Sequence, residues 1–261
     1  MKFDVIIGNP PYQNGKNSQF YAKFIQAAEL LLEDGGYFSL LTPSKASLPS
    51  SKSSPTLKAL GWSSVEFNLE SFFTSQGQTI ARYSGVKGST SDIITVTCNG
   101  ESREFPAGSV FPVHEVDFTA IDILQKFFSY SKKLNWVKLR EEPAGSYVYT
   151  ARVAKGFSET KPKGGKYAFV SHVNKCDEYF DGRFLSCESQ EQAEQYRWML
   201  RQSRLYRFAV FSCTRAKFVP PLFWQLTPDL VEFTTNEELY NAVNLTPQEV
   251  DYIDEWNKLN D

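Results

Sequence analysis

The start of the chain combines short apolar runs with one amphipathic stretch. Residues 3–7 are mostly apolar and run into Gly8 and two prolines, a pattern typical of a buried strand that ends abruptly. Residues 18–32 carry apolar side chains at helical spacing and are followed by two glycines, which predicts a helix and its C-terminal end. A second apolar run, residues 37–42, ends at another proline. Strand, helix and strand together predict a βαβ unit with parallel strands.

The following residues predict further strands and a helix. Residues 44–64 are rich in Ser, Lys and Pro and predict a loop near the carboxyl ends of the first strands. Runs with β-branched residues predict strands, and a stretch that begins with a capping Asp117 predicts a helix. The predicted strands are residues 65–73, 79–83 and 93–98, and the predicted helix is residues 117–128.

The residue composition of the chain changes near residue 132. Glycine pairs, tyrosines and lysines alternate there with short β-like runs, and a helix is predicted from Ser189. The C-terminal end has two capped helix starts, at Thr235 and Thr246. The β-like runs are residues 147–153 and 167–173. These patterns predict an α/β region at residues 1–131, a mixed α+β region at residues 132–233 and acidic helices at residues 234–261.

Composition is that of an ordinary globular chain. The 261 residues are 41% hydrophobic and 22% charged, enough for one large core or two modest ones. No apolar run approaches the roughly 20 residues of a membrane span, and the N-terminus lacks the pattern of a signal peptide, so we expect a cytoplasmic protein. The four cysteines form no CxxC pair and the two histidines lie far apart. We therefore expect no metal site and no disulfide framework, but reduced, partly buried thiols.

Charge is distributed unevenly along the chain. Residues 132–217 carry 17 Lys and Arg against 9 Asp and Glu, whereas residues 1–131 carry 10 against 12 and residues 218–261 carry 1 against 9. A basic block between acidic flanks can be the footprint of a polyanion. A solvated, lysine-rich surface explains the charge pattern equally well.

The turn after the first strand holds groups that suit a planar amine. Its two prolines prevent both a continuing ladder and an immediate helix, so a rigid turn presents the Asn9 amide and the Pro10 carbonyl at the carboxyl edge of the sheet. Both oxygens can accept the two N–H groups of an amine on an aromatic ring, and Tyr12 can stack on that ring. Accepting both protons localises the nitrogen lone pair, which can then attack an electrophilic methyl group in line. The alternative is that these residues form only a structural Pro-Pro turn after the strand and take part in no reaction.

The run FDVIIGNPPYQ resembles the motif of amino-methyltransferases that depend on S-adenosylmethionine, above all the DNA adenine-N6 methyltransferases. Protein-glutamine and rRNA-guanine methyltransferases carry similar versions. The resemblance implies a Rossmann-like methyltransferase sheet, of which residues 1–131 hold the catalytic half. It also implies S-adenosylmethionine as cofactor, catalytic roles for Asn9, Pro10, Pro11 and Tyr12, and an adenine swung out of the duplex.

Segments after the motif resemble the same family. Aromatic or apolar residues that open the next helix of the family pack on the adenine of the cofactor, which implies this role for Phe20 and Phe24; a plain core role is the alternative. A nearby loop lies against DNA in the family, which implies phosphate contacts for Lys45 and Lys52. The run YSGVKGSTSDIITV resembles a late hairpin whose leading aromatic residue stacks on the extruded base, and Tyr83 holds that place.

A basic helix face and the C-terminal end favour DNA as substrate. Arg197, Arg201, Arg204 and Arg207 are spaced by three and four residues, which predicts one helix face. Such a face suits DNA because arginines contact phosphates and base edges, although a solvated face with internal ion pairs would look the same. The segments SRLYRFAVFS and VPPLF and the acidic end resemble the C-terminus of the Eco57I-like branch of restriction-modification methyltransferases. The implied partners are duplex DNA and either a second chain that carries the cofactor-binding motif or a nuclease.

One motif of the family is missing from the sequence. Family members carry a glycine-rich turn that grips the amino-acid end of the cofactor, but Gly35 and Gly36 follow a predicted helix and Gly164 and Gly165 lie in a basic stretch. We therefore expect only half of a cofactor pocket. The chain could be the catalytic and target-recognition portion of an adenine methyltransferase whose cofactor-binding portion lies on a second chain or was lost. The alternatives are a DNA-binding protein without turnover and a methyltransferase that acts on glutamine or rRNA.

Overall fold

The structure, a computed structural model, consists of two compact units, Met1–Ile121 and Asp122–Asp261. Each unit has its own sheet. The boundary lies inside helix α3 (Phe118–Tyr130), before the boundary expected at residue 131. The residues that the structure describes are 1–12, 20–49, 51–69, 79–113, 116–131, 134, 144–151, 171–173, 182–213 and 233–260.

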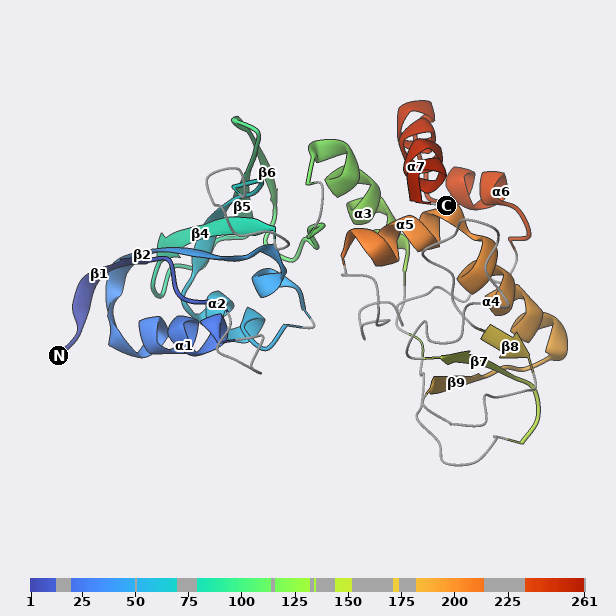
Figure 1. The fold of residues 1–261 in the computed structure, drawn as a ribbon, viewed down its shortest axis with the longest axis horizontal. Helices are drawn as coiled ribbons and strands as arrows, with labels where there is room; N and C mark the ends of the chain where they lie inside the picture. The colour runs from blue at the N-terminus through green and yellow to red at the C-terminus, as the bar shows by residue number, and fades with distance from the viewer. Residues whose placement is uncertain are drawn as a thin grey trace. The chain divides into compact units, whose positions relative to one another are not determined.

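Unit 1 is built on a six-stranded mixed sheet with the strand order β1-β2-β4-β3-β5-β6 (Figure 1). β1 and β2 run parallel and are joined by helix α1, which lies along one face of the sheet, so the predicted βαβ unit is confirmed. β4 pairs antiparallel with both β2 and β3, and β3 runs parallel to β5. The elements are β1 (Phe3–Gly8), α1 (Tyr21–Leu31), β2 (Leu32–Pro43), the 3-10 helix η1 (Ser44–Ser47), α2 (Ser54–Ala59), β3 (Trp62–Glu66), β4 (Ile80–Val86), β5 (Ile93–Cys98) and β6 (Glu101–Pro106).

The core of unit 1 lies on the α1 face of this sheet. Leu40, Tyr83, Val65 and Val96 lie side by side on four neighbouring strands, and all four are buried. Ile25 of α1 belongs to the same buried cluster. Because side chains alternate along a strand, the residues between these core positions point to the opposite face. Helix α1 therefore packs on the face of the sheet that carries these core residues.

Lys87 closes the C-terminal end of α1. Its Nζ donates to the carbonyl oxygens of Glu29 at 2.7 Å and Leu32 at 2.9 Å, and it lies 3.4 Å from a carboxylate oxygen of Asp34. The last carbonyls of a helix have no partner within the helix and carry the negative end of its dipole. A lysine directly after β4 therefore satisfies them and joins α1 to the sheet.

The two glycines that were predicted to end this helix lie within β2 instead. Gly35 has a φ of 82°, a conformation that favours glycine, and a Cβ at Gly36 would lie 2.9 Å from the carbonyl oxygen of Asp4 in β1. The glycines thus allow the shift in register between β1 and β2 and the close approach of β1. The helix ends earlier, at Leu31.

Two other predictions for unit 1 are wrong. Residues 83–96 are not a hairpin, because β3 lies between β4 and β5 in the sheet. Residues 44–64 are not one loop, because they contain η1 and α2 and reach into β3. Helix α2 forms because a proline stands in its first turn and Leu57 is fully buried in the core.

Unit 2 combines a three-stranded antiparallel sheet, of order β8-β7-β9, with helices α4 to α7. Phe208 of α5 joins it to α7, since its ring centroid lies 5.8 Å from that of Tyr252 and 5.5 Å from that of Trp256. None of the helices described in either unit is long and apolar enough to cross a membrane. The elements are β7 (Tyr147–Ala151), β8 (Ser171–Val173), β9 (Gly182–Ser186), α4 (Gln190–Gln202), α5 (Arg204–Ser212), α6 (Asn236–Ala242) and α7 (Pro247–Asn260).

Both helix starts predicted near the C-terminus are confirmed. Thr235 and Glu238 form a capping box at α6, in which each side chain accepts from the backbone N–H of the other residue. At α7 the Thr246 backbone N–H donates to Glu249 at 2.6 Å, and the Glu249 N–H donates to the Thr246 hydroxyl at 3.3 Å. Lys126 of α3 pairs with the same Glu249 carboxylate at 2.6 Å, so the second cap also ties α7 to α3.

The single helix predicted to carry four arginines is in fact two helices. Ser203 has a φ of −70° and a ψ of 115°, which breaks the helix, and its hydroxyl caps the start of α5. Arg197 and Arg201 therefore lie on α4, and Arg204 and Arg207 lie on α5. The spacing of three and four does not produce one continuous basic face.

Candidate functional site

The Asn-Pro-Pro-Tyr turn follows directly on β1. The Asn9 side chain is exposed, Pro10 is buried, and Tyr12 is half-buried and packs against the core of unit 1. The Tyr12 hydroxyl donates to Asn9 Oδ1 at 2.9 Å. Burial raises the pKa of Tyr12, so the hydroxyl keeps its proton and remains a donor. The turn thus holds the Asn9 amide in one direction at the carboxyl end of the strand.

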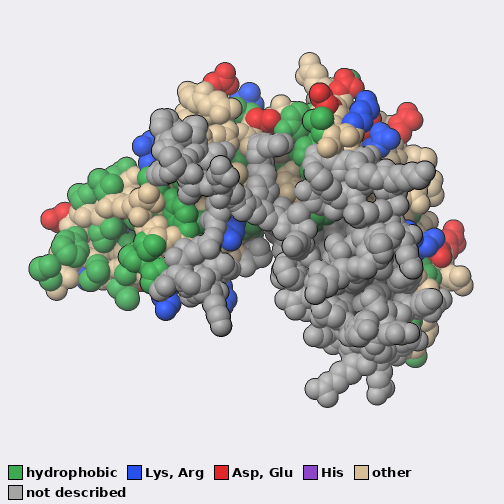
Figure 2. All heavy atoms as spheres, in the orientation of Figure 1, with side chains coloured by type: hydrophobic (Ala, Val, Ile, Leu, Met, Phe, Trp, Pro, Cys, Tyr) green, Lys and Arg blue, Asp and Glu red, His purple; other side chains and the backbone are tan. Residues whose placement is uncertain are grey.

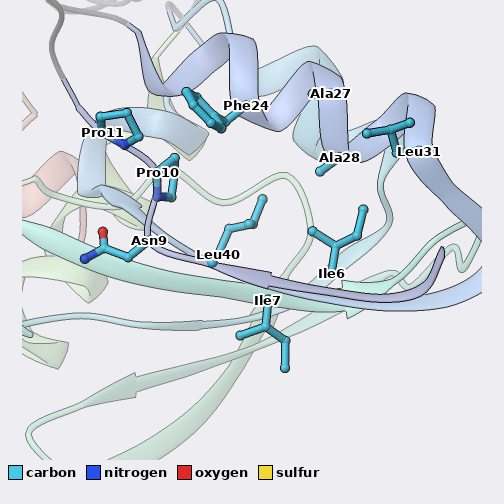
Figure 3. A pocket seen from close by; sticks show the side chains of 11 residues that line it. Ile6, Ile7, Asn9, Pro10, Pro11, Phe24, Ala27, Ala28, Leu31 and Leu40 are labelled. Atoms are coloured by element: carbon cyan, nitrogen blue, oxygen red, sulfur yellow. The ribbon is translucent and has the colours of Figure 1, made fainter. Parts of the chain in front are cut away.

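A pocket of about 320 Å³ lies beside this turn (Figure 3). In Figure 3, Ile6 and Leu40 point toward α1, whereas Ile7 points away from it. Apart from Asn9, all the lining side chains are apolar, so the pocket suits a flat, apolar group. The lining residues are Ile6, Ile7, Gly8, Asn9, Pro10 and Pro11 from β1 and the turn, Phe24, Ala27, Ala28 and Leu31 from α1, and Leu40 from β2.

The two predicted cofactor-contacting residues have different positions. Phe24 lines the pocket and is 40% exposed. Phe20 packs edge-on against it, with ring centroids 5.5 Å apart, and Lys23 Nζ lies 5.6 Å from the Phe20 ring centroid. Phe24 can therefore contact a ligand in the pocket, while Phe20 supports the Phe24 ring from outside.

Tyr83 is a core residue, which corrects the expected stacking role. Its ring is fully buried and lies edge-on to Trp62, with centroids 5.3 Å apart. Its hydroxyl donates to the carbonyl oxygen of Ser44 at 2.6 Å and lies 3.0 Å from the Ser47 hydroxyl. Burial raises the pKa of Tyr83 well above its ordinary value. A ring enclosed on all sides offers no face to a base, so Tyr83 instead anchors η1 to the sheet.

Of the two lysines expected to contact phosphates, one lies in η1, which Tyr83 anchors, and the other lies after it. Lys45 is half-buried within η1, and Lys52 is exposed just before α2. The segment is also held internally, since the Ser53 hydroxyl donates to the carbonyl oxygen of Ala46 at 2.8 Å. Phosphate contacts for these lysines stay a prediction.

The arginines expected to contact DNA belong to unit 2. Arg197 donates to the Glu194 carboxylate at 2.7 Å, and an Arg204 guanidinium nitrogen lies 2.9 Å from an Asp254 carboxylate oxygen. Arg201 is exposed near the end of α4. The internal ion pairs of Arg197 and Arg204 match the alternative that the sequence left open for these positions.

The described cysteines are weakly reactive thiols. Cys98 and Cys213 are buried and Cys187 is half-buried. Burial raises the pKa of Cys98 to about 12 and that of Cys187 to about 11, so both stay protonated near neutral pH. Cys176 lies outside the described residues. Among the residues that the structure describes, no group of three or more His, Cys, Asp and Glu could hold a metal ion.

The aliphatic lining of the pocket was not predicted from the sequence. Ala27, Ala28 and Leu31 lie three, four and seven residues after Phe24, on the same face of α1. A pair of small residues behind an aromatic one is the signal that could have indicated the pocket, because alanines leave room between helix and sheet. The same spacing also describes any helix packed on a sheet, so it does not separate a pocket from a core.

The fold and the site define a class: a mixed α/β unit that presents an Asn-Pro-Pro-Tyr turn and an apolar pocket where the first strand of a parallel pair ends. Residues 1–59 match the sequence model of a family described as Eco57I restriction-modification methylase. This segment contains β1, the turn, α1, β2, η1 and α2, and therefore every residue that lines the pocket. No curated protein matches the chain.

Several solved structures are similar to part of the chain. The M protein of the type I restriction enzyme EcoKI is 17% identical, with 37% of this chain and 25% of that chain covered and a TM-score of 0.32. A structure of a type I restriction-modification system is 16% identical, with 37% and 24% covered and a TM-score of 0.33. The type IIG restriction endonuclease BpuSI is 17% identical, with 54% and 21% covered and a TM-score of 0.29. The chain thus spans a quarter or less of these proteins.

Proposed function

We propose that this chain is the catalytic and target-recognition portion of a DNA adenine-N6 methyltransferase that uses S-adenosylmethionine and takes its remaining cofactor contacts from a second chain. One observation carries the proposal: the Asn-Pro-Pro-Tyr turn stands at the carboxyl end of β1, directly beside an apolar pocket. The match of residues 1–59 to a methylase family supports it. Duplex DNA is the proposed substrate.

The residues of the turn would hold and activate the target amine. Asn9 Oδ1 already accepts one hydrogen bond from Tyr12. A carbonyl oxygen has two lone pairs, so the same atom can also accept an N–H of the adenine amine. The Pro10 carbonyl would accept the second N–H, and the Tyr12 ring would stack on the flipped base. With both N–H groups held by hydrogen bonds, the nitrogen keeps its protons and its lone pair is directed out of the ring plane, ready to attack.

The pocket fits part of the cofactor. Its volume of about 320 Å³ is at the small end of ligand pockets, and Phe24, Ala27 and Leu31 offer an apolar wall for a planar ring such as adenine. No charged side chain lines it in the part of the chain that the structure describes, so the charged amino-acid end of the cofactor would need groups from elsewhere. When bound, the cofactor supplies an electrophilic methyl group. The residues of this chain would position the amine and exclude water.

Isothermal titration of S-adenosylmethionine into the full chain, with and without adenine-containing duplex DNA, tests the cofactor site. Phe24→Ala removes the aromatic wall and is expected to weaken cofactor binding about 10-fold, because stacking on an aromatic side chain contributes roughly 1–3 kcal/mol. Leu30→Ala is the matched control, since Leu30 lies on the same helix, is 69% exposed and is not a lining residue. Equal affinities for the two variants would show that the pocket does not hold the cofactor.

Transfer of a tritiated methyl group, measured with duplex DNA, RNA and protein as competing acceptors, tests the substrate. Asn9→Ala is expected to abolish transfer to DNA while cofactor binding persists, because Asn9 holds the amine and not the cofactor ring. A preference for RNA or protein would favour the rRNA or glutamine alternative. Binding of DNA with no transfer under any condition, with cofactor and second chain supplied, would favour a DNA-binding protein without turnover.

A further inference from the structure

The Asn-Pro-Pro-Tyr turn offers two acceptor oxygens, and they are held by different means. The ring of Pro10 fixes its own φ, and the following Pro11 restricts the next backbone torsion to extended values. Pro10 is also buried. Its carbonyl oxygen is therefore held by covalent geometry and packing. The Asn9 oxygen, in contrast, lies at the end of a side chain that can rotate about χ1 and χ2.

The pairing of β1 with β2 does not extend to Asn9. Its last pair joins Gly8 to Leu40, one residue before Asn9. The Asn9 side chain is exposed, and Figure 3 shows it directed away from Leu40 and α1. An exposed amide samples several rotamers unless a contact selects one of them. The direction of the Asn9 oxygen therefore depends on a side-chain contact.

The hydroxyl of Tyr12 supplies this contact. It donates to Asn9 Oδ1 at 2.9 Å. The other residues that line the pocket beside Asn9 are apolar, so their side chains offer its amide no donor. Figure 2 shows hydrophobic side chains, in green, gathered at this β1 and α1 end of unit 1. Within the part of the chain that the structure describes, Tyr12 is thus the hydrogen-bond partner of the Asn9 side chain.

The Tyr12 side chain is itself held in place, as a group that orients another must be. Its ring is half-buried and packs against the core of unit 1. The two prolines that separate Tyr12 from Asn9 have fixed φ angles, so the backbone between the two side chains is stiff. A packed ring on a stiff turn can therefore fix the position of its hydrogen-bond partner.

We propose that the hydroxyl of Tyr12 is a positioning group that fixes Asn9 Oδ1 as the acceptor for one N–H of the target amine. This role is separate from the stacking of the Tyr12 ring, which would bind the base. The proposal rests on the proposed function only for the identity of the amine. Oδ1 keeps a second lone pair while it accepts from Tyr12, so the hydrogen bond can persist throughout the reaction. The acceptor is then oriented before the amine arrives.

Tyr12→Phe separates the hydroxyl from the ring, because Phe keeps the stacking surface and loses the donor. Methyl transfer by the full chain, with cofactor and second chain supplied, is expected to lose about 10-fold in kcat at an unchanged KM for duplex DNA. A 10-fold loss corresponds to about 1.4 kcal/mol. The affinity for S-adenosylmethionine should stay the same, since Tyr12 does not line the pocket. Tyr37→Phe is the matched control: it removes a 43% exposed hydroxyl side chain from β2 and should keep the wild-type kcat.

Restoring a donor distinguishes the hydrogen bond from the shape of the side chain. A p-aminophenylalanine in place of Tyr12 carries an N–H donor at the same ring position and is expected to recover kcat to within about 3-fold of wild type. If it stays as slow as Tyr12→Phe, the loss comes from packing and the proposal is wrong. Equal kcat for Tyr12→Phe and wild type, or a raised KM for DNA at unchanged kcat, would overturn it as well.

NMR relaxation of the Asn9 side-chain amide measures the positioning without turnover. In the full chain with ¹⁵N-labelled asparagine, the Asn9 NH₂ signal is assigned by its absence from the spectrum of Asn9→Ala. Its order parameter is expected to exceed about 0.6 in the wild type and in Tyr37→Phe, and to fall below about 0.6 in Tyr12→Phe. An order parameter that Tyr12→Phe leaves unchanged would refute the positioning role, whatever the rates.

These measurements separate the positioning of Asn9 from the proposed function. If Tyr12→Phe frees the Asn9 amide but the wild-type protein transfers no methyl group to DNA, the proposed function fails and the orientation of Asn9 by Tyr12 stands. If the wild-type protein methylates DNA and Tyr12→Phe changes neither kcat nor the order parameter, the proposed function stands and the positioning role fails.

Discussion

Replacing Tyr83 by Phe tests whether this side chain serves the core or a base. The hydroxyl donates to the buried carbonyl of Ser44 at 2.6 Å and lies 3.0 Å from the half-buried Ser47 hydroxyl. Phe keeps the ring and its contact with Trp62 but removes this donor. A buried carbonyl without its partner costs about 1–3 kcal/mol, whereas the Ser47 hydroxyl can turn to water. We therefore expect Tyr83→Phe to lower the free energy of unfolding of unit 1 by about 2 kcal/mol.

Hydrogen exchange followed by mass spectrometry suits this prediction because it reports unit 1 separately from unit 2. A loss of about 2 kcal/mol corresponds to roughly 30-fold faster exchange of the slowest β4 amides. Tyr37→Phe is the matched control, since Tyr37 lies on the neighbouring strand and is 43% exposed, and it should change stability by less than about 0.5 kcal/mol. If Tyr83→Phe matched this control while Tyr83→Ala selectively weakened DNA binding, the core assignment would be refuted and base stacking restored.

Three further predictions follow from contacts outside the proposed site. Lys87→Met leaves two carbonyls at the end of α1 without a donor and should destabilise unit 1 by about 1–3 kcal/mol in urea titrations. The pKa of Cys187 is raised to about 11. In a Cys176→Ser variant, Cys187 should therefore react with iodoacetamide roughly 100-fold more slowly at pH 8 than an unstructured cysteine. The reaction rate should rise as the pH approaches this pKa. Hydrogen bonds from the backbone of Thr234 and Thr235 lower the pKa of the Glu238 carboxyl group. The stabilisation of α6 by Glu238 should therefore be present above the ordinary glutamate pKa and disappear as the pH falls through the lowered pKa. An NMR titration of the carboxyl carbon would measure this pKa.

The first βαβ unit could be predicted from the sequence because its signals are local. A change from a compact apolar run to helical spacing and back marks β1, α1 and β2 without reference to distant residues. The order of the later strands could not be predicted in this way. Residues 83–96 contain two β-like runs joined by Gly and Ser, which is typical of a hairpin. β3 instead inserts beside β4, where a Cβ at Gly85 would meet the carbonyl oxygen of Gly61, and this close approach is visible only in three dimensions.

In the candidate site, too, residues with a local sequence signal could be predicted and residues that depend on distant contacts could not. Asn9 and Tyr12 could be selected from residue chemistry alone, because a proline-stiffened strand end restricts where their side chains can go. The burial of Tyr83 depends on β3, η1 and the core closing around it, and no local pattern distinguishes a buried tyrosine from one on a surface. The helix break at Ser203 was hidden because arginines continue at helical spacing across it, although a serine that caps the next helix is a recognised break signal.

β1 carries the turn that we propose to be catalytic, and within the described part of the chain it pairs with one strand, β2. A catalytic side chain has to be held within about 0.5 Å of its productive position. On its inner side β1 is fixed by β2, with Gly8 paired to Leu40, and beyond that point the exposed Asn9 amide is held by one hydrogen bond from Tyr12. The proposed chemistry at Asn9 should therefore depend on this hydrogen bond from Tyr12.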